Sequence, residues 1–135
     1  MKVDTSNLNP SAKFYFDDDN PKDGHITLRS LSIKEINEIS GLCTKKQPPE
    51  YRRGVRYEIP AKVDEKLQME LLWDKAIVDW KGIEEAKTDK AVPCTTENKI
   101  KFMKTWAWFA LFVGNSLDQL NIDLTATPKD LEIKN

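Results

Sequence analysis

The run from Trp106 to Val113, WAWFALFV, is the most apolar stretch of this chain and restricts its fold more than any other feature. It has eight residues, whereas a helix that crosses a bilayer needs about twenty. Apolar side chains continue around it at helical spacings of three and four, at Ile100, Met103, Trp106 or Ala107, Ala110, Val113 and Leu117. We therefore predict a buried core helix that Thr95 caps, and not a membrane anchor.

A second long helix is predicted from Asp64 to Trp80. Its apolar residues recur at helical positions along one face, namely Met69, Leu72, Trp73, Ala76 and Trp80. Gly82 is expected to end this helix. The charged segment 83–93 that follows has no periodicity, so it is predicted to be a surface loop.

The N-terminal third of the chain predicts a β-hairpin and a short helix. The segments KFYFD and HITLRSL alternate like strands on either side of a turn-rich loop, which places Phe14, Phe16, Ile26 and Leu28 on one face. Ser32 and Glu35 have the spacing of a capping box, which predicts a helix from Ile33 to Ser40 with Gly41 as its C-terminal cap.

Residues 44–53 contain Pro-Pro and four basic side chains, and we predict a mobile loop there. Val55, Tyr57 and Ile59 alternate with polar residues, and this allows a third short strand at the hairpin edge. The predicted fold class is α+β and mainly helical, with the hairpin packed on a short helix and two long helices. Residues 1–12 are expected to form a loose arm, 13–121 a single domain, and 122–135 a polar tail.

Residues that carry catalytic or metal chemistry are few and poorly placed. His25 is the single histidine and adjoins the hairpin loop, and the five glycines are isolated, so neither a catalytic triad nor a phosphate loop is indicated. The acidic loop with Asp23-Gly24 fails as a calcium loop, because Pro21 and Ser30 fall where ligands belong. Asp74 and Asp79 are five residues apart and face different sides of the predicted helix. We predict no enzyme activity, no cofactor and no metal site.

Charge and cysteine content restrict the partners and the compartment. The net charge of −1 provides no long-range field for nucleic acid or anionic lipid. A local basic loop, with Lys45, Lys46, Arg52 and Arg53 around Tyr51, leaves a nucleic-acid site at 45–53 as an alternative to a solvated loop. Cys43 and Cys94 are predicted to be reduced thiols, and the N-terminus lacks the pattern of a secretory signal.

Large aromatic residues are too numerous on the two long helices for one packing seam. They are Trp73, Trp80, Trp106, Trp108, Phe109 and Phe112. Most are expected to be core, and we predict that some lie on a surface that a partner protein covers. Self-association through such a surface is left open.

Three segments in this order resemble the small tail assembly chaperones of tailed bacteriophages and prophages, over about residues 13–120. KFYFD through GHITLRSLSIKEINEI comes first. The block A-I-x-D-W-x-G is then matched by Ala76, Ile77, Asp79, Trp80 and Gly82, and the helix opening Pro-x-Thr-x-Glu-Asn by Pro93, Thr95, Glu97 and Asn98. The loop EEAKTDKAVP between them lacks a glycine that this family leads us to expect.

The resemblance implies a protein of the bacterial host cytoplasm that binds the tape measure protein, keeps it soluble and helps to recruit tail tube subunits. Some members also have a longer frameshifted product. Two alternatives remain: a structural tail component retained in the virion, and a small nucleic-acid-binding protein that uses the basic loop.

Overall fold

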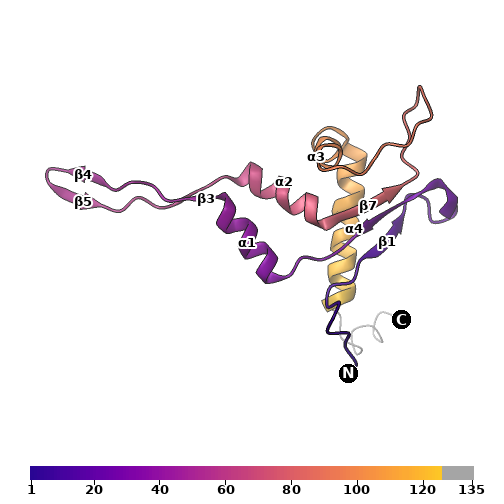
Figure 1. Cartoon of the computed structure of the whole chain (residues 1–135), viewed down its shortest axis with the longest axis horizontal. Helices are drawn as coiled ribbons and strands as arrows, with labels where there is room; N and C mark the ends of the chain where they lie inside the picture. The colour runs from indigo at the N-terminus through magenta and orange to yellow at the C-terminus, as the bar shows by residue number, and fades with distance from the viewer. Residues whose placement is uncertain (126–135) are drawn as a thin grey trace. The chain divides into compact units, whose positions relative to one another are not determined.

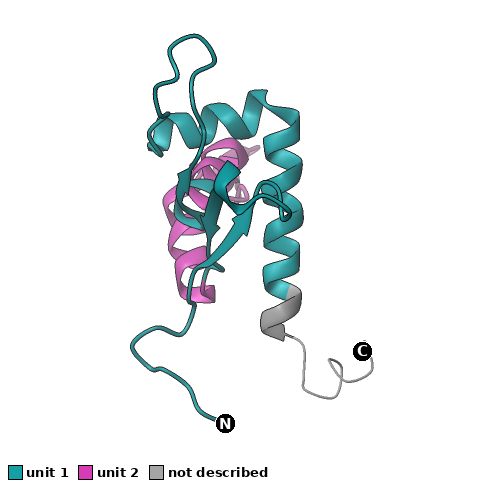
Figure 2. Ribbon diagram, turned by 90° about the vertical axis from the view of Figure 1, so that its right-hand side faces the viewer, with its two compact units in different colours: residues 1–31, 73–135 teal, residues 32–72 magenta. Residues whose placement is uncertain are grey.

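The computed structural model describes residues 1–125 and divides the chain into two compact units (Figure 2). Unit 1 contains Met1–Leu31 and the chain from Trp73 onward, and unit 2 contains Ser32–Leu72. The α+β, mainly helical fold class with N-terminal strands is confirmed. Of the predicted polar tail, residues 126–135 lie outside the described part of the chain, while helix α4 continues to Thr125.

Unit 1 contains a three-stranded antiparallel sheet in the order β1-β2-β7 (Figure 1). The strands are β1 (Ala12–Tyr15), β2 (His25–Leu28) and β7 (Ile77–Lys81), with a short 3-10 turn at Pro21–Asp23 between the first two. Phe14 pairs with Ile26, which pairs on its other side with Trp80. The predicted N-terminal hairpin is therefore confirmed, but the third strand of its sheet is residues 77–81 and not 55–59.

The predicted helix from Asp64 to Trp80 is wrong at its C-terminal end. Helix α2 covers Glu65–Ala76, and the chain then turns directly into β7. A hydrogen bond from the Arg29 N–H to the Ala76 carbonyl, 3.0 Å long, marks the point where the chain joins the sheet. From Ile77 onward, the backbone N–H and C=O groups find their hydrogen-bond partners in the neighbouring strand β2 and not in a further helical turn.

A bulge in β7 explains why its sequence looks helical. Leu28 pairs with Ile77 and Thr27 with Asp79, so Val78 has no residue opposite it. The extra residue shifts the alternation of side chains. Ile77 and Trp80, three positions apart, are therefore both buried on the core face.

The predicted long helix after Thr95 is two helices, α3 (Thr96–Thr105) and α4 (Ala107–Thr125). The N-cap is confirmed, because the Thr95 side chain accepts a hydrogen bond from the Asn98 N–H at 3.2 Å. The break comes at Trp106, whose φ of −108° and ψ of 94° are extended. Just before it, the Thr105 hydroxyl donates to the Lys101 carbonyl at 2.6 Å, the kind of bond that bends helices.

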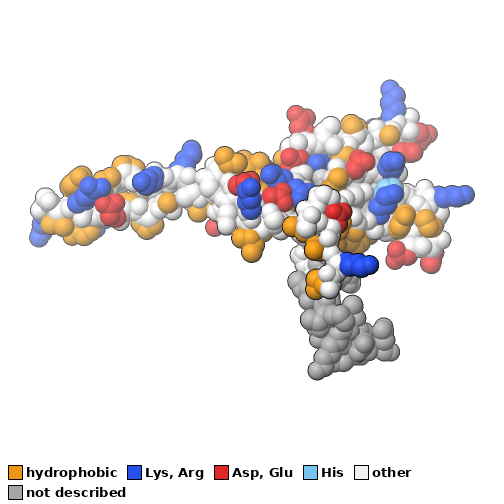
Figure 3. Space-filling model, turned by 60° about the horizontal axis from the view of Figure 1, so that its bottom comes forward, with side chains coloured by type: hydrophobic (Ala, Val, Ile, Leu, Met, Phe, Trp, Pro, Cys, Tyr) orange, Lys and Arg blue, Asp and Glu red, His pale blue; other side chains and the backbone are white. Residues whose placement is uncertain are grey.

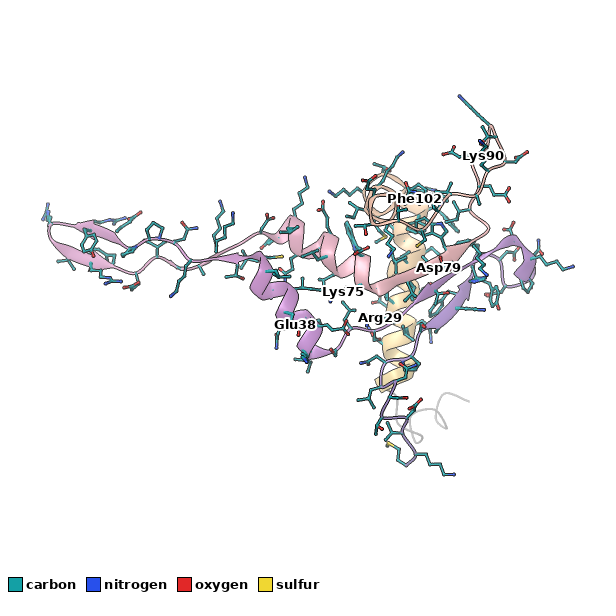
Figure 4. The ribbon with its side chains drawn as sticks, in the orientation of Figure 1. Arg29, Glu38, Lys75, Asp79, Lys90 and Phe102 are labelled. Atoms are coloured by element: carbon teal, nitrogen blue, oxygen red, sulfur yellow. The ribbon has the colours of Figure 1, made fainter. Side chains whose placement is uncertain are left out.

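The core of unit 1 joins the sheet to α4. Its buried members come from β2, β7 and α4, and they are Ile26, Leu28, Ile77, Trp80, Phe109, Val113 and Leu120. On α4 the buried positions are Phe109, Val113, Ser116 and Leu120, which follow one face of the helix. Figure 4 labels Phe102 on α3, whose ring lies 5.6 Å from that of Phe109. The partly buried Phe14 and Phe16 also pack against this core, as the hairpin pattern predicts.

In unit 2, helix α1 (Ile33–Cys43) begins as predicted but ends later. Both hydrogen bonds of the Ser32–Glu35 capping box are present. The predicted end at Ser40 with a Gly41 cap is wrong, because the helix continues through Gly41 and is capped by Thr44. The continued turn brings Cys43 into a buried position beside Ile39 on the same helical face.

Residues 44–63 of unit 2 form a two-stranded antiparallel ribbon, which we call the β-arm. Its base pairs β3 (Thr44–Lys45) with β6 (Lys62–Val63), and its tip pairs β4 (Glu50–Arg52) with β5 (Val55–Tyr57). The prediction of a loop at 44–53 is therefore wrong at Thr44–Lys45 and Glu50–Arg52, which are strands. Val55–Tyr57 is a strand, but its partner is β4 and not the N-terminal hairpin. A two-residue turn, Arg53-Gly54, joins β4 to β5. Both residues have positive φ, 51° and 78°, as a type I′ turn requires.

Candidate partner-binding surface

The six aromatic residues singled out from the sequence divide into three groups in unit 1. Trp80 and Phe109 are buried in the core, and the Trp80 indole N–H donates to the Val92 carbonyl at 2.8 Å. Trp73 and Phe112 are partly buried against the same core. Trp106 and Trp108 are exposed, with 39% and 47% of their surface open. A docking surface built from these residues therefore centres on Trp106 and Trp108.

The two exposed indoles lie on buried or half-buried rings. Trp106 stacks on Phe109 with ring centroids 5.5 Å apart and an interplanar angle of 16°. Trp108 stacks on Phe112 at 5.3 Å and 19°, and the two indoles are 5.5 Å from each other. Stacking against fixed rings limits the motion of both indoles. Little side-chain entropy of the indoles is therefore lost when a partner covers them.

The helix break at Trp106 creates this arrangement. In an unbroken helix, residues two apart point to different sides. The extended backbone at Trp106 brings its ring beside that of Trp108, and a cavity of about 280 Å³ opens next to the pair. The cavity is lined by Phe16, Asp23, Gly82, Ile83, Glu84, Trp106 and Trp108. Its lining combines apolar side chains with two carboxylate residues, Asp23 and Glu84.

Sequence reasoning did not identify the loops that complete this cavity. Asp23 and Gly82 come from two loops whose backbones touch, because a Cβ on Gly82 would lie 2.5 Å from the Asp23 carbonyl oxygen. Gly24 and Gly82 both have positive φ. A signal was available in the sequence: each glycine directly adjoins a strand end, where close backbone approach often requires one.

Asp74 and Asp79 do not form a carboxylate pair. Asp74 belongs to a network with Lys99, whose ammonium group lies 3.2 Å from the carboxylate and 3.0 Å from the Asp74 carbonyl. The Thr96 hydroxyl donates to the same carboxylate at 2.8 Å. This network ties the end of α2 to the start of α3 and satisfies a lysine that is only 8% exposed. Asp79 is exposed on β7 (Figure 4).

Both cysteines are free thiols with raised pKa values. Burial is the main cause in each case; it raises the pKa of Cys94 to about 11, and the nearby Lys99 ammonium offsets only part of the effect. The pKa of Cys43 is raised by burial and by the Asp64 carboxylate. Thiols of this kind are protonated at neutral pH and are poor nucleophiles.

We expect Cys94 to react slowly in the folded protein and to make stability pH-dependent in alkali. Between the ordinary thiol pKa of 9.0 and the folded value of about 11, the unfolded chain loses its proton first. Its contribution to stability is therefore complete below about pH 9 and is lost as the pH rises through about 11. In a Cys43→Ser background, labelling by an aromatic disulfide at pH 8 should be slow in buffer and fast in urea; equal rates would contradict the burial.

The remaining titratable candidates form no site. His25 begins β2, and its ring meets the Tyr15 ring edge-on at 5.6 Å. Within residues 1–125, no group of three or more His, Cys, Asp or Glu side chains is placed to hold a metal ion. None of the described helices combines the length and the apolar character that a membrane span requires.

Comparisons with known proteins do not assign this chain to a family. No protein-family model, no curated protein and no solved structure matches this chain.

Proposed function

We propose that this chain is a tail assembly chaperone of a tailed phage or prophage, acting in the host cytoplasm on the tape measure protein and assisting tail tube assembly. The observation that carries the proposal is the pair of exposed indoles, Trp106 and Trp108, held on Phe109 and Phe112. Exposed, rigid aromatic surface is the type of surface that protein interfaces favour. A long, aggregation-prone client needs such cover before it is assembled.

The segments that resemble the family have defined structural roles here, which supports the proposal. In the first block, Ile77 and Trp80 are core residues of β7, and Gly82 makes the close loop contact. In the second, the Asn98 side chain donates to the Pro93 carbonyl at 2.9 Å and Thr95 caps α3. Both blocks help to fix the path from the sheet to α3.

Co-expression with the tape measure protein of the same genome tests the proposal. We expect the tape measure protein to be more soluble with this chain than without it, and the gain to be lost with Trp106→Ser and Trp108→Ser together. Leu111→Ser is the matched control, because Leu111 is 66% exposed on the same helix but lies outside the indole pair. Purified virions should lack the chain.

Two results would count against this function. If the tape measure protein is equally insoluble with and without the chain, the client is wrong. If the chain is present in stoichiometric amounts in purified particles, it is a structural tail component. Circular dichroism of the double variant establishes that a loss of function is not a loss of fold, since both indoles are partly solvent-exposed.

A further inference from the structure

The β-arm has a single register from its base to its tip. Thr44 pairs with Val63 at the base and Glu50 with Tyr57 near the tip, and each strand has four residues between the two ladders. Prolines at positions 48, 49 and 60 explain why the middle lacks ladder bonds. With ten residues in each strand, the arm is about 33 Å long at the usual rise per residue. It is one continuous element, and Figure 1 labels its strands β3, β4 and β5.

The charge of the β-arm is opposite to that of the remainder of the chain. Residues 44–63 contain six Lys or Arg and two Glu, a net charge of +4 in a chain whose total is −1. Two arginines are held by neighbours: Arg52 lies 3.2 Å from Glu50, and Arg56 lies 2.8 Å from Glu58. Arg53 at the turn has no carboxylate within salt-bridge distance among the described residues. The tip therefore offers cationic groups to a partner.

Apolar side chains alternate with these cations. Every residue from Glu50 to Glu58 is exposed, including Tyr51, Val55 and Tyr57, which leave about half or more of their surface open. Arg52 lies over the Tyr57 ring at 5.6 Å. Figure 3 shows the hydrophobic and basic side chains interleaved along the arm. Among residues 1–125, the β4–β5 ladder pairs with no third strand. Since isolated two-stranded ribbons are at best marginally stable in water, such a surface gains from being covered.

The positive charge and the apolar side chains of the β-arm restrict the kind of molecule that can bind it. A second β-arm, also at +4, would be repelled. Nucleic acid satisfies the cations, but it would bring phosphates against Glu50 and Glu58, which pair with Arg52 and Arg56, and would leave aliphatic Val55 without an apolar contact. An acidic polypeptide with apolar side chains satisfies both the charge and the apolar surface.

We propose that the β-arm, residues 44–63, is a docking site for an acidic, apolar-containing segment of another protein. Carboxylates of that segment engage Arg53 and the lysines of the arm, and its apolar side chains cover Val55 and Tyr57. The exposed ladder edges are available for added main-chain hydrogen bonds. This surface shares no residue with the indole pair, and the inference does not depend on the chaperone assignment.

Binding of a labelled random copolymer of glutamate and tyrosine to the full chain, followed by fluorescence anisotropy, tests this inference. We expect binding at low salt that weakens as salt is added, and weaker binding of polyglutamate, which lacks the apolar part. Arg53→Asn with Lys46→Gln should reduce the affinity about tenfold or more. Asn tolerates the positive φ of position 53, so the turn is retained. Val55→Thr with Tyr57→Thr should reduce copolymer binding but leave polyglutamate binding unchanged.

The matched control is Lys87→Asn with Lys90→Gln, which removes two exposed cations from a loop of unit 1. It should change the affinity by less than about twofold. Equal loss in this control, or no copolymer binding by the wild-type chain, overturns the proposal. Tighter binding of oligothymidine or duplex DNA would make nucleic acid the ligand. Arm-dependent self-association in sedimentation, without copolymer binding, would make a second copy the partner; either result also overturns it.

Discussion

Phe109→Ala should destabilise the protein by about 3–5 kcal/mol, the largest effect we expect from a single substitution in unit 1. The Phe109 side chain is 0% exposed and has three aromatic neighbours, Trp80, Phe102 and Trp106, with ring centroids 5.5 to 5.7 Å away. Truncation to alanine removes these contacts and leaves a cavity, because the neighbouring rings are rigid and cannot move to fill it. A domain of this kind is stable by only about 5–15 kcal/mol, so the loss is a large share of the total.

Urea unfolding, followed by tryptophan fluorescence and circular dichroism, measures this effect. Leu111→Ala is the control on the same helix, because Leu111 is mostly exposed. It should change the free energy of unfolding by no more than about 0.5 kcal/mol. If both substitutions cost the same, α4 does not pack through the face that carries Phe109. Because Phe109 also supports Trp106, Phe109→Ala should in addition weaken partner binding through the exposed indoles.

Gly82→Val is expected to cost about 2–4 kcal/mol, because two separate effects act at one position. Its φ of +89° is unfavourable for a β-branched residue, and a Cβ there would lie 2.5 Å from the Asp23 carbonyl oxygen and 2.6 Å from the Gly24 Cα. Both neighbours are backbone and can move only if the two loops separate. We expect β7 to lose its fixed position against β2, with a lower midpoint in urea.

Gly114→Ala is the matched glycine control and should have the opposite sign. Gly114 lies within α4, and a Cβ there would meet nothing within 4 Å. Alanine in a helix interior is favoured over glycine by about 0.5–1 kcal/mol, so the variant should be more stable than wild type. A stabilising Gly82→Val, or a neutral one, would show that the two loops do not touch.

Local signals in the sequence predicted the parts of the fold that depend on neighbouring residues. The Ser32 capping box, the Thr95 cap and the N-terminal hairpin each rest on a short motif whose hydrogen bonds are made within a few residues. The errors occur where a distant segment decides the structure. Ile77 and Trp80 have helical spacing, but pairing with β2, some fifty residues earlier, makes them a bulged strand.

The candidate surface was predictable in composition but not in geometry. The sequence indicated that Trp106, Trp108, Phe109 and Phe112 include both core and surface residues. It could not indicate which, because the helix break at Trp106 has no proline or glycine to mark it and rearranges the rings around Phe109. The β-arm was missed for a different reason: its prolines argued against strands, and the Arg53-Gly54 turn lacks the Asn or Asp that commonly begins a type I′ turn.

The hydrogen bond from the Arg29 N–H to the Ala76 carbonyl allows the segment between these residues to change in length. The chain leaves the sheet after Arg29 and returns to it at Ala76, and the Arg29 nitrogen and the Ala76 oxygen lie 3.0 Å apart, so the intervening segment, which includes unit 2, is a loop with closed ends. The entropy of closing such a loop grows only with the logarithm of its length, about 0.6 kcal/mol for each doubling. We therefore expect changes of length within residues 44–63 of this chain to leave its central sheet in place.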